Sequence, residues 1–148
     1  ILGAEAFAHH RPRMDEFKDS YDPRVWVRIR RGENLSAADL IDCHRNRADI
    51  IARASDMAMP FDALLMPTCP TVAPAIEPLD SDEDAYGAAN ILMLRNTTVG
   101  NFLDSCAMSI PCHAPGTGPV GLMVLAATRH DEWLTRIALS IERALGRR

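Results

Sequence analysis

The chain has 148 residues, 47% of them hydrophobic and 24% charged, so its composition is that of a globular protein and excludes disorder and collagen-like repeats. Sixteen basic residues against twenty acidic ones give a net charge of −4, and without a basic stripe no nucleic-acid partner is expected. The longest apolar run, near residues 120–127, is far shorter than the ~20 residues that cross a bilayer, so no membrane partner is expected.

The first third of the chain predicts helices. An Ala-rich stretch predicts a helix from Ile1 to about His10, followed by a polar, irregular segment. Asp22 before Pro23 supplies an N-cap and an N1 proline, which predicts a short helix over residues 23–31. Gly32 stands where a C′ glycine terminates a helix.

A longer helix is predicted next. Ser36 and Asp39 resemble a capping box in which Asp replaces the usual Glu. From there a helix runs to about Met57, with several apolar residues on or near one face: Leu40, Ile41, Ala48, Ile51 and Ala52.

The remaining elements alternate between strands and helices. The apolar segment from Phe61 to Pro67 predicts a fully buried strand. The prolines that follow predict irregular structure to about Leu79. The acidic residues Asp80–Asp84 are expected to form a solvated loop. We then predict a helix over 85–103, strands over 106–110 and 120–127, and a final helix. Asp131 should cap this final helix, whose apolar stripe is Leu134, Ile137, Ala138, Ile141 and Leu145.

This order predicts an α/β layered fold with about three strands and flanking helices. We treat residues 1–148 as a single domain or a fragment of one. The chain begins Ile-Leu-Gly-Ala without Met, so we expect it to be the C-terminal piece of a longer protein. Its four cysteines (Cys43, Cys69, Cys106 and Cys112) lack zinc-site spacing, so we expect no metal. Because no secretory signal is recognisable, we expect reduced thiols and a cytoplasmic location.

Three segments carry a distinctive pattern of prolines, hydroxyl residues and glycine. The first runs from Asp62 through Pro67-Thr68-Cys-Pro to Pro74. The second runs from Asn96 through Asn101 and Ser109 to Pro111, and the third is Pro119-Val-Gly-Leu-Met-Val. In this order and spacing, the three resemble the C-terminal region of the amidase signature family of hydrolases, and the likeness covers nearly the whole chain. The resemblance implies the C-terminal portion of that family's α/β/α layered fold.

The sequence departs from the family pattern at three positions. Asp104 and Cys106 stand where many members carry Gly and Pro, and Met123 stands where Gln often follows. These differences favour the amide-hydrolysing or allophanate-type branches over the glutamyl-tRNA amidotransferase branch.

The family's catalytic residues are absent from this chain. The resemblance implies a serine nucleophile, a bridging serine and a buried lysine beside a Gly/Ser-rich loop, acting on a small carboxamide without metal or cofactor. The one lysine, Lys18, lies in a polar segment, and no serine lies in a Gly/Ser-rich loop. We therefore assign no catalytic residue here and expect the chain alone to be inactive.

Substrate-binding residues are nevertheless expected on the helix over 85–103. Ile91, Leu94, Arg95 and Thr98 follow at i, i+3, i+4 and i+7 and share one face, and the family resemblance places this helix on the substrate channel. Arg95 would bind a substrate carboxylate, or else form a structural ion pair with Asp104 or the acidic loop. Asn101 would shape the pocket wall or tie the helix to the next loop. Thr68 completes the predicted substrate-binding set.

Two other functions remain open: a noncatalytic relic or interaction module, and a subunit of a glutamine-dependent amidotransferase. The strands read as buried on both faces, yet few helices are present to cover them. We therefore expect self-association through uncovered apolar surface.

Overall fold

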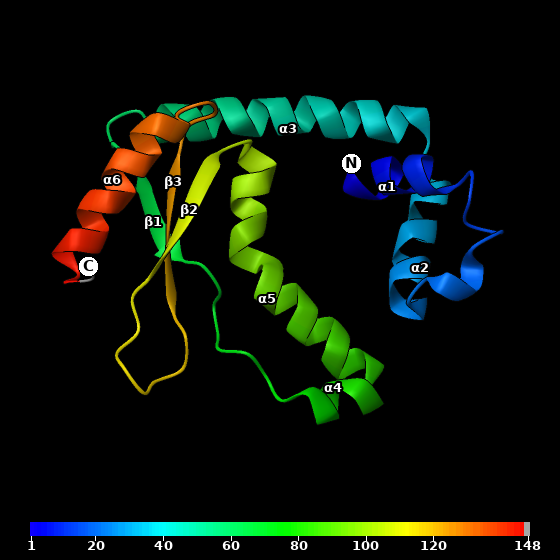
Figure 1. Ribbon diagram of the computed structural model, residues 1–148. Coiled ribbons are helices and arrows are strands. Elements are labelled where there is room, and N and C mark those ends of the chain that lie inside the picture. The colour runs from blue at the N-terminus through cyan, green and yellow to red at the C-terminus, as the bar shows by residue number, and fades with distance from the viewer. Residues whose placement is uncertain (147–148) are drawn as a thin grey trace. The chain divides into compact units, whose positions relative to one another are not determined.

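The computed structural model describes residues 1–146 and divides the chain into two compact units (Figure 1). The first comprises residues 1–50 and the second begins at Ile51. The long helix α3, Ala37–Ala58, contributes to both.

Short helices build the first unit: α1 (Leu2–His10), the 3₁₀ helix η1 (Lys18–Ser20), α2 (Pro23–Arg30) and the 3₁₀ helix η2 (Arg31–Asn34). The predicted N-cap of α2 is confirmed, because Asp22 Oδ1 accepts hydrogen bonds from the backbone N–H groups of Arg24 at 2.8 Å and Val25 at 3.2 Å. Met14 and Ile29 are the buried hydrophobic side chains of this unit.

Gly32 lies directly after Arg31, the C-cap of α2, as predicted, but glycine is needed there for a different reason. The chain continues into η2 instead of turning left-handed at this glycine. A Cβ atom on Gly32 would lie 1.9 Å from the carbonyl oxygen of Gly3 and 2.8 Å from the Cβ of Phe7. Glycine is required here because α1 packs directly against the backbone of η2.

The capping box before α3 is confirmed. Asp39 Oδ2 accepts hydrogen bonds from the Ser36 N–H at 3.0 Å and the Ser36 hydroxyl at 2.7 Å, while the Asp39 N–H donates to Ser36 Oγ at 3.1 Å. These hydrogen bonds from Ser36 hold the pKa of the Asp39 carboxyl below its usual value, because they favour the charged form. The predicted apolar face of α3 is only partly covered: Leu40 and Ile51 are half-buried, but Ile41 is 52% exposed.

The second unit has the predicted order of strands and helices, with one helix added. Its elements are β1 (Leu64–Pro67), α4 (Ile76–Ser81), α5 (Glu83–Leu103), β2 (Cys106–Pro111), β3 (Gly121–Ala126) and α6 (Asp131–Ala144). The strands form one antiparallel sheet in the order β1-β3-β2. Leu65 of β1 and Met108 of β2 both pair with Val124, which fixes the register.

Helices flank the sheet on both faces, as the predicted layered fold requires (Figure 1). On one face, Ile110, Val124 and Ala126 form the core with Leu134 and Ala138 of α6. On the other, α5 approaches at Gly100, where an added Cβ would lie 3.3 Å from Leu125 Cδ2. The apolar stripe of α6 is thus confirmed except at Leu145, which is 45% exposed.

The prediction that all strands are buried was wrong for two of them. Residues Met123 to Ala126 of β3 are buried, but Ile110 is the one buried residue of β2, and Leu65 of β1 is 54% exposed. In a three-stranded sheet, only the central strand has neighbours on both sides. The two outer strands are edges whose side chains extend past the covering helices.

Three further boundaries differ from the prediction. The segment over 76–81 is helical despite Pro78, because a proline in the first turn of a helix loses no intrahelical hydrogen bond. The acidic residues that follow are not a loop: Asp82 caps α5, accepting from the N–H groups of Asp84 at 2.9 Å and Ala85 at 3.0 Å. At α6 the cap is His130, and Asp131 lies in the first turn, where its charge complements the helix dipole.

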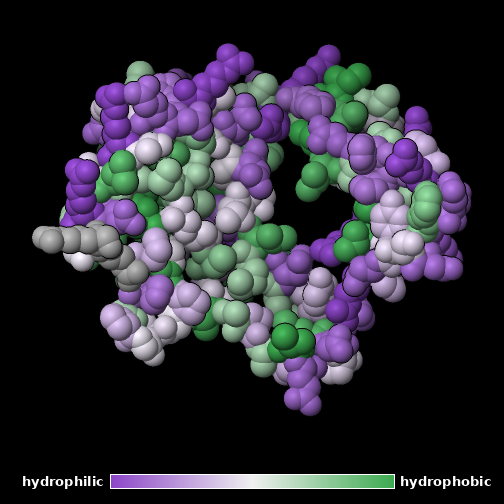
Figure 2. Space-filling model, viewed as in Figure 1, coloured by the Kyte–Doolittle hydropathy of each residue, from purple (hydrophilic) through white to green (hydrophobic). Residues whose placement is uncertain are grey.

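Hydrophobic side chains also lie on the surface, interspersed with polar ones (Figure 2). On α5, Ile91, Leu92 and Leu94 are 72%, 41% and 51% exposed. No helix in the described part of the chain combines the length and the apolarity that a bilayer crossing needs.

Candidate functional site

The three motif segments meet at one end of the sheet. Thr68 directly follows β1, Ser109 lies in β2 and Gly121 begins β3. The Thr68 N–H donates to the Gly121 carbonyl at 2.8 Å, and the hydroxyl oxygens of Thr68 and Ser109 are 2.6 Å apart. A Cβ atom on Gly121 would lie 2.5 Å from Ser109 Oγ and 2.7 Å from Thr68 Oγ1. Only glycine leaves room for this hydroxyl pair.

Helix α5 joins the same group of residues through Asn96. Its Nδ2 donates to the Pro67 carbonyl at 2.7 Å, and its Oδ1 accepts from Arg95 Nε at 3.3 Å. We call Pro67, Thr68, Asn96, Ser109 and Gly121 the motif cluster; Arg95 lies beside it. Thr68 and Arg95 belong to the substrate-binding set predicted from sequence, whereas Asn96, which bonds Arg95 and the Pro67 carbonyl next to Thr68, does not.

The predicted face of α5 lies at the surface. Ile91, Leu94, Arg95 and Thr98 are all at least partly exposed, and the Thr98 hydroxyl donates to the Leu94 carbonyl at 2.7 Å. Arg95 donates to Asn96 and, among residues 1–146, forms no ion pair with Asp104. An exposed guanidinium beside apolar side chains is a suitable binding group for an anion.

Two of the polar residues in the second motif segment lie at the end of α5. Asn101 is exposed, and its backbone carbonyl accepts from the Asp104 N–H at 3.4 Å. Asp104 is the C-cap and adopts the left-handed conformation with φ of 57°. Glycine is the usual residue at such a left-handed helix end, because it adopts that backbone geometry without strain.

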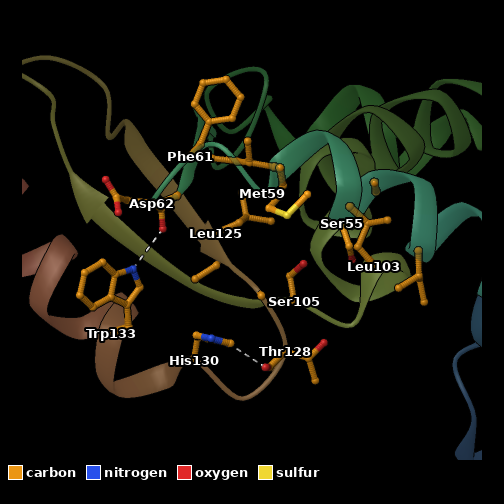
Figure 3. Close-up of a pocket in the computed structure, with 17 residues that line it drawn as sticks. Ser55, Met59, Phe61, Asp62, Leu103, Ser105, Leu125, Thr128, His130 and Trp133 are labelled. Atoms are coloured by element: carbon orange, nitrogen blue, oxygen red, sulfur yellow. Dashed lines mark hydrogen bonds between the residues drawn. The ribbon is translucent and has the colours of Figure 1, made fainter.

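A cavity of about 640 Å³ lies at the opposite end of the sheet (Figure 3). The end of α3, the start of β1 and the start of α6 contribute to its wall, with Met59, Phe61, Leu125 and Trp133 among the apolar side chains. Trp133 Nε1 donates to the Asp62 carbonyl at 3.2 Å. The described residues that line this cavity include none of the six predicted substrate-binding residues, and no sequence motif pointed to it.

The cysteines and the acidic residues form no metal centre in the described residues. No group of three or more His, Cys, Asp or Glu side chains there is arranged to hold an ion. All four cysteines are free, and the half-buried Cys106 donates its thiol to the Ala127 carbonyl at 3.1 Å.

Comparison with known proteins identifies the class to which this fold and motif cluster belong. The family model "Amidase" matches residues 11–135. The chain therefore belongs to the amidase family, which confirms the resemblance seen in the sequence.

Individual relatives agree with this assignment. The chain is 32% identical over 129 residues to "2-amino-5-chloromuconic acid deaminase" of Comamonas testosteroni, covering 84% of this chain and 27% of that protein. It is 33% identical over 131 residues to the glutamyl-tRNA(Gln) amidotransferase A-type subunit of Salinispora arenicola, covering 85% of this chain and 26% of the relative. The chain thus spans about a quarter of the length of these two relatives.

A solved structure confirms the predicted fold. A crystal structure of an amidase superposes with a TM-score of 0.79 at 19% sequence identity, over 97% of this chain and 33% of that one. The sheet and its flanking helices therefore form part of an amidase fold.

Proposed function

We propose that the whole protein hydrolyses the C–N bond of a small carboxamide, releasing a carboxylic acid and ammonia. In this proposal the present chain is a C-terminal segment that supplies core structure and part of the substrate-binding wall. The observation that carries the proposal is the convergence of Thr68, Ser109 and Gly121, one residue from each family segment, in a chain that matches the amidase model.

The surroundings of Lys18 support the view that this chain carries no catalytic base. A lysine that acts as a base needs a buried site that disfavours its charged form. Lys18 is exposed, and its ammonium nitrogen lies 5.4 Å from the centre of the Trp26 ring, so it does not occupy such a buried site. The nucleophile and the base would therefore come from the remainder of the amidase domain.

The exposed face of α5 supports an anionic substrate. Ile91, Leu94, Arg95, Thr98 and Asn101, together with Thr68, form the proposed substrate-binding set. The Arg95 guanidinium would pair with a carboxylate, as in an acidic amide or an allophanate-like compound. The relative from Comamonas testosteroni is named for a substrate that is itself a carboxylic acid, which agrees with this choice.

A second candidate is a subunit of a glutamine-dependent amidotransferase. Relatives from two Salinispora species and from mycobacteria are named as glutamyl-tRNA(Gln) amidotransferase subunits, at 27% to 33% identity. Such a subunit would pass ammonia to a partner-bound acceptor. An amidase needs no partner, so ammonia release by the purified full-length protein separates the two functions.

The test uses the full-length protein and this chain in parallel, with matched anionic and neutral amides. We expect ammonia release from the full-length protein and none from the chain. Arg95→Met should raise KM for the anionic amide by about 10-fold or more, the value of a charge-assisted hydrogen bond, and leave the neutral amide within about 2-fold. Arg143→Met, on α6, is the control for the loss of a surface charge. Turnover by the chain alone would overturn its assignment as noncatalytic, and an equal loss on both amides would overturn the role of Arg95.

We further propose that the isolated chain self-associates and that the protein acts in the cytoplasm. The exposed side chains of Leu64 and Leu65 on the edge strand β1 support the first point, since an uncovered apolar edge pairs readily. The four free cysteines agree with a reducing compartment. Sedimentation of the chain as a monomer at high concentration would contradict self-association. Stable self-association with no activity in the full-length protein would instead favour a noncatalytic interaction module.

A further inference from the structure

We propose that Asn96 is a positioning residue that orients the Arg95 guanidinium toward an anionic group of the substrate. This inference rests on the proposed function, because it concerns how Arg95 would recognise that anion. Asn96 itself would not touch the substrate and would act only through Arg95.

The orientation of the Asn96 side chain follows from its partner on the sheet. The Pro67 carbonyl can only accept, so the atom 2.7 Å from it must be the amide nitrogen, Nδ2. The other end of the amide, Oδ1, then faces Arg95 and accepts from its Nε at 3.3 Å. One planar group thus uses a donor toward the sheet and an acceptor toward the arginine.

The partner that holds Asn96 is itself fixed. Pro67 ends β1 and pairs with Leu122 of β3. The next residue, Thr68, donates its N–H to Gly121 at 2.8 Å and shares the hydroxyl contact with Ser109. The position of the Asn96 amide is therefore set by the sheet and not only by its own helix.

This arrangement leaves the outer part of the guanidinium available. With Nε bound to Asn96, the two terminal nitrogens of Arg95 retain their four N–H donors for a ligand. An exposed arginine that is unrestrained loses rotamer entropy when it binds an anion. Holding Nε in advance removes part of that cost, so Asn96 should strengthen anion binding without making a contact of its own.

The experiment is a double-mutant cycle in the full-length protein, measured with succinamate as the anionic amide and butyramide as the neutral one. Asn96→Ala should raise KM for succinamate by about 5-fold, with kcat and the butyramide constants within about 2-fold, because one hydrogen bond to a charged group is lost. In an Arg95→Met background, Asn96→Ala should have no further effect on succinamate. Asn90→Ala, which removes another half-buried amide of α5, should leave the selectivity unchanged.

A second variant keeps the proposal testable if Asn96→Ala lowers the yield of folded protein. Asn96→Asp keeps the size of the side chain but replaces the donor toward Pro67 with an acceptor and puts a negative charge beside Arg95. That carboxylate would compete with succinamate, so selectivity for succinamate over butyramide should fall by about 10-fold or more.

The outcomes separate this proposal from the one on which it rests. If Arg95→Met weakens succinamate selectively but neither Asn96 variant does, or if the Asn96→Ala effect persists without Arg95, the positioning role is overturned and the anion site stands. If Arg95→Met affects both amides equally, the anion site itself fails, and the role of Asn96 fails with it.

Discussion

Thr68 and Ser109, 41 residues apart in the sequence, hold their hydroxyl oxygens 2.6 Å from each other beside Gly121. The pair connects the segment after β1 to strand β2 across the first residue of β3. Each member comes from a different motif segment of the amidase family, so this contact gives a physical reason for three elements of the family pattern at once.

The first prediction concerns Gly121. Gly121→Ala should lower the free energy of unfolding of the chain by about 1–3 kcal/mol, because the new methyl group would overlap both hydroxyls. The loss should shrink when Ser109→Ala removes the nearer oxygen. Gly87→Ala is the matched control: its Cβ would meet nothing within 4 Å in α5, so stability should rise by up to about 1 kcal/mol. Urea unfolding of the Gly121→Ala, Gly121→Ala/Ser109→Ala and Gly87→Ala variants measures these differences in stability. Equal effects at the two glycines would refute the steric argument.

The second prediction concerns Asp104, whose φ of 57° is unfavourable for a residue with a side chain. Asp104→Gly should raise the free energy of unfolding by about 0.5–1 kcal/mol, whereas Asp104→Ala should lower it by a similar amount. The hydrogen bond from the Thr128 hydroxyl to the Asp104 carbonyl survives both changes, since it uses the backbone. Thermal unfolding of the two variants should therefore move in opposite directions, and a shift in the same direction would contradict a backbone origin.

The third prediction concerns the pH dependence of the capping box. Hydrogen bonds from Ser36 lower the pKa of Asp39 in the folded protein, so its ionised form is favoured by folding. This contribution to stability is complete above the unfolded-state pKa, near 3.8, and is lost as the pH falls through the lower folded-state pKa. Ser36→Ala should lower stability at pH 7 and reduce its acid dependence. Unfolding curves from about pH 2 to neutral pH measure this, and an unchanged acid dependence would argue against the box.

The fourth prediction compares two leucines of α6. Leu134 is 3% exposed and packs in the core, so Leu134→Ala should cost about 2–5 kcal/mol through the cavity it leaves. Leu139, on the same helix, is 45% exposed, and Leu139→Ala should cost less than about 1 kcal/mol. Chemical denaturation of the two variants checks the predicted difference. Similar losses would show that α6 is covered on both sides in solution.

Local chemistry made several elements predictable from sequence. The caps at Asp22 and at Ser36 depend on residues two or three positions away, so their hydrogen bonds can be predicted without the fold. The buried side of α6 follows in the same way from the spacing of Leu134 and Ala138. Both caps were confirmed, whereas the cap predicted at Asp131 lies one residue earlier, at His130.

Long-range pairing explains what was not predicted. That β3 lies between β1 and β2 cannot be deduced from the apolar character of the strands, so Leu65 was wrongly placed in the interior. For the same reason the hydrogen bond of Asn96 could not be predicted, because its acceptor, the Pro67 carbonyl, is 29 residues away and is reached only once the sheet has formed. The substrate-binding role of the α5 face stays a prediction, and the kinetic test of Arg95 addresses it.

The central position of β3 also determines the order in which the second unit can assemble. Leu64 of β1 has its backbone partner at Leu125, and β2 likewise pairs with β3 and not with β1. During synthesis, β1 and β2 both leave the ribosome before the one strand that can join them. Non-local pairing of this kind slows folding and leaves strand edges unprotected for longer. Both outer strands must therefore wait for residues 121–126, and deletion of that segment should leave β1 and β2 with no sheet to join.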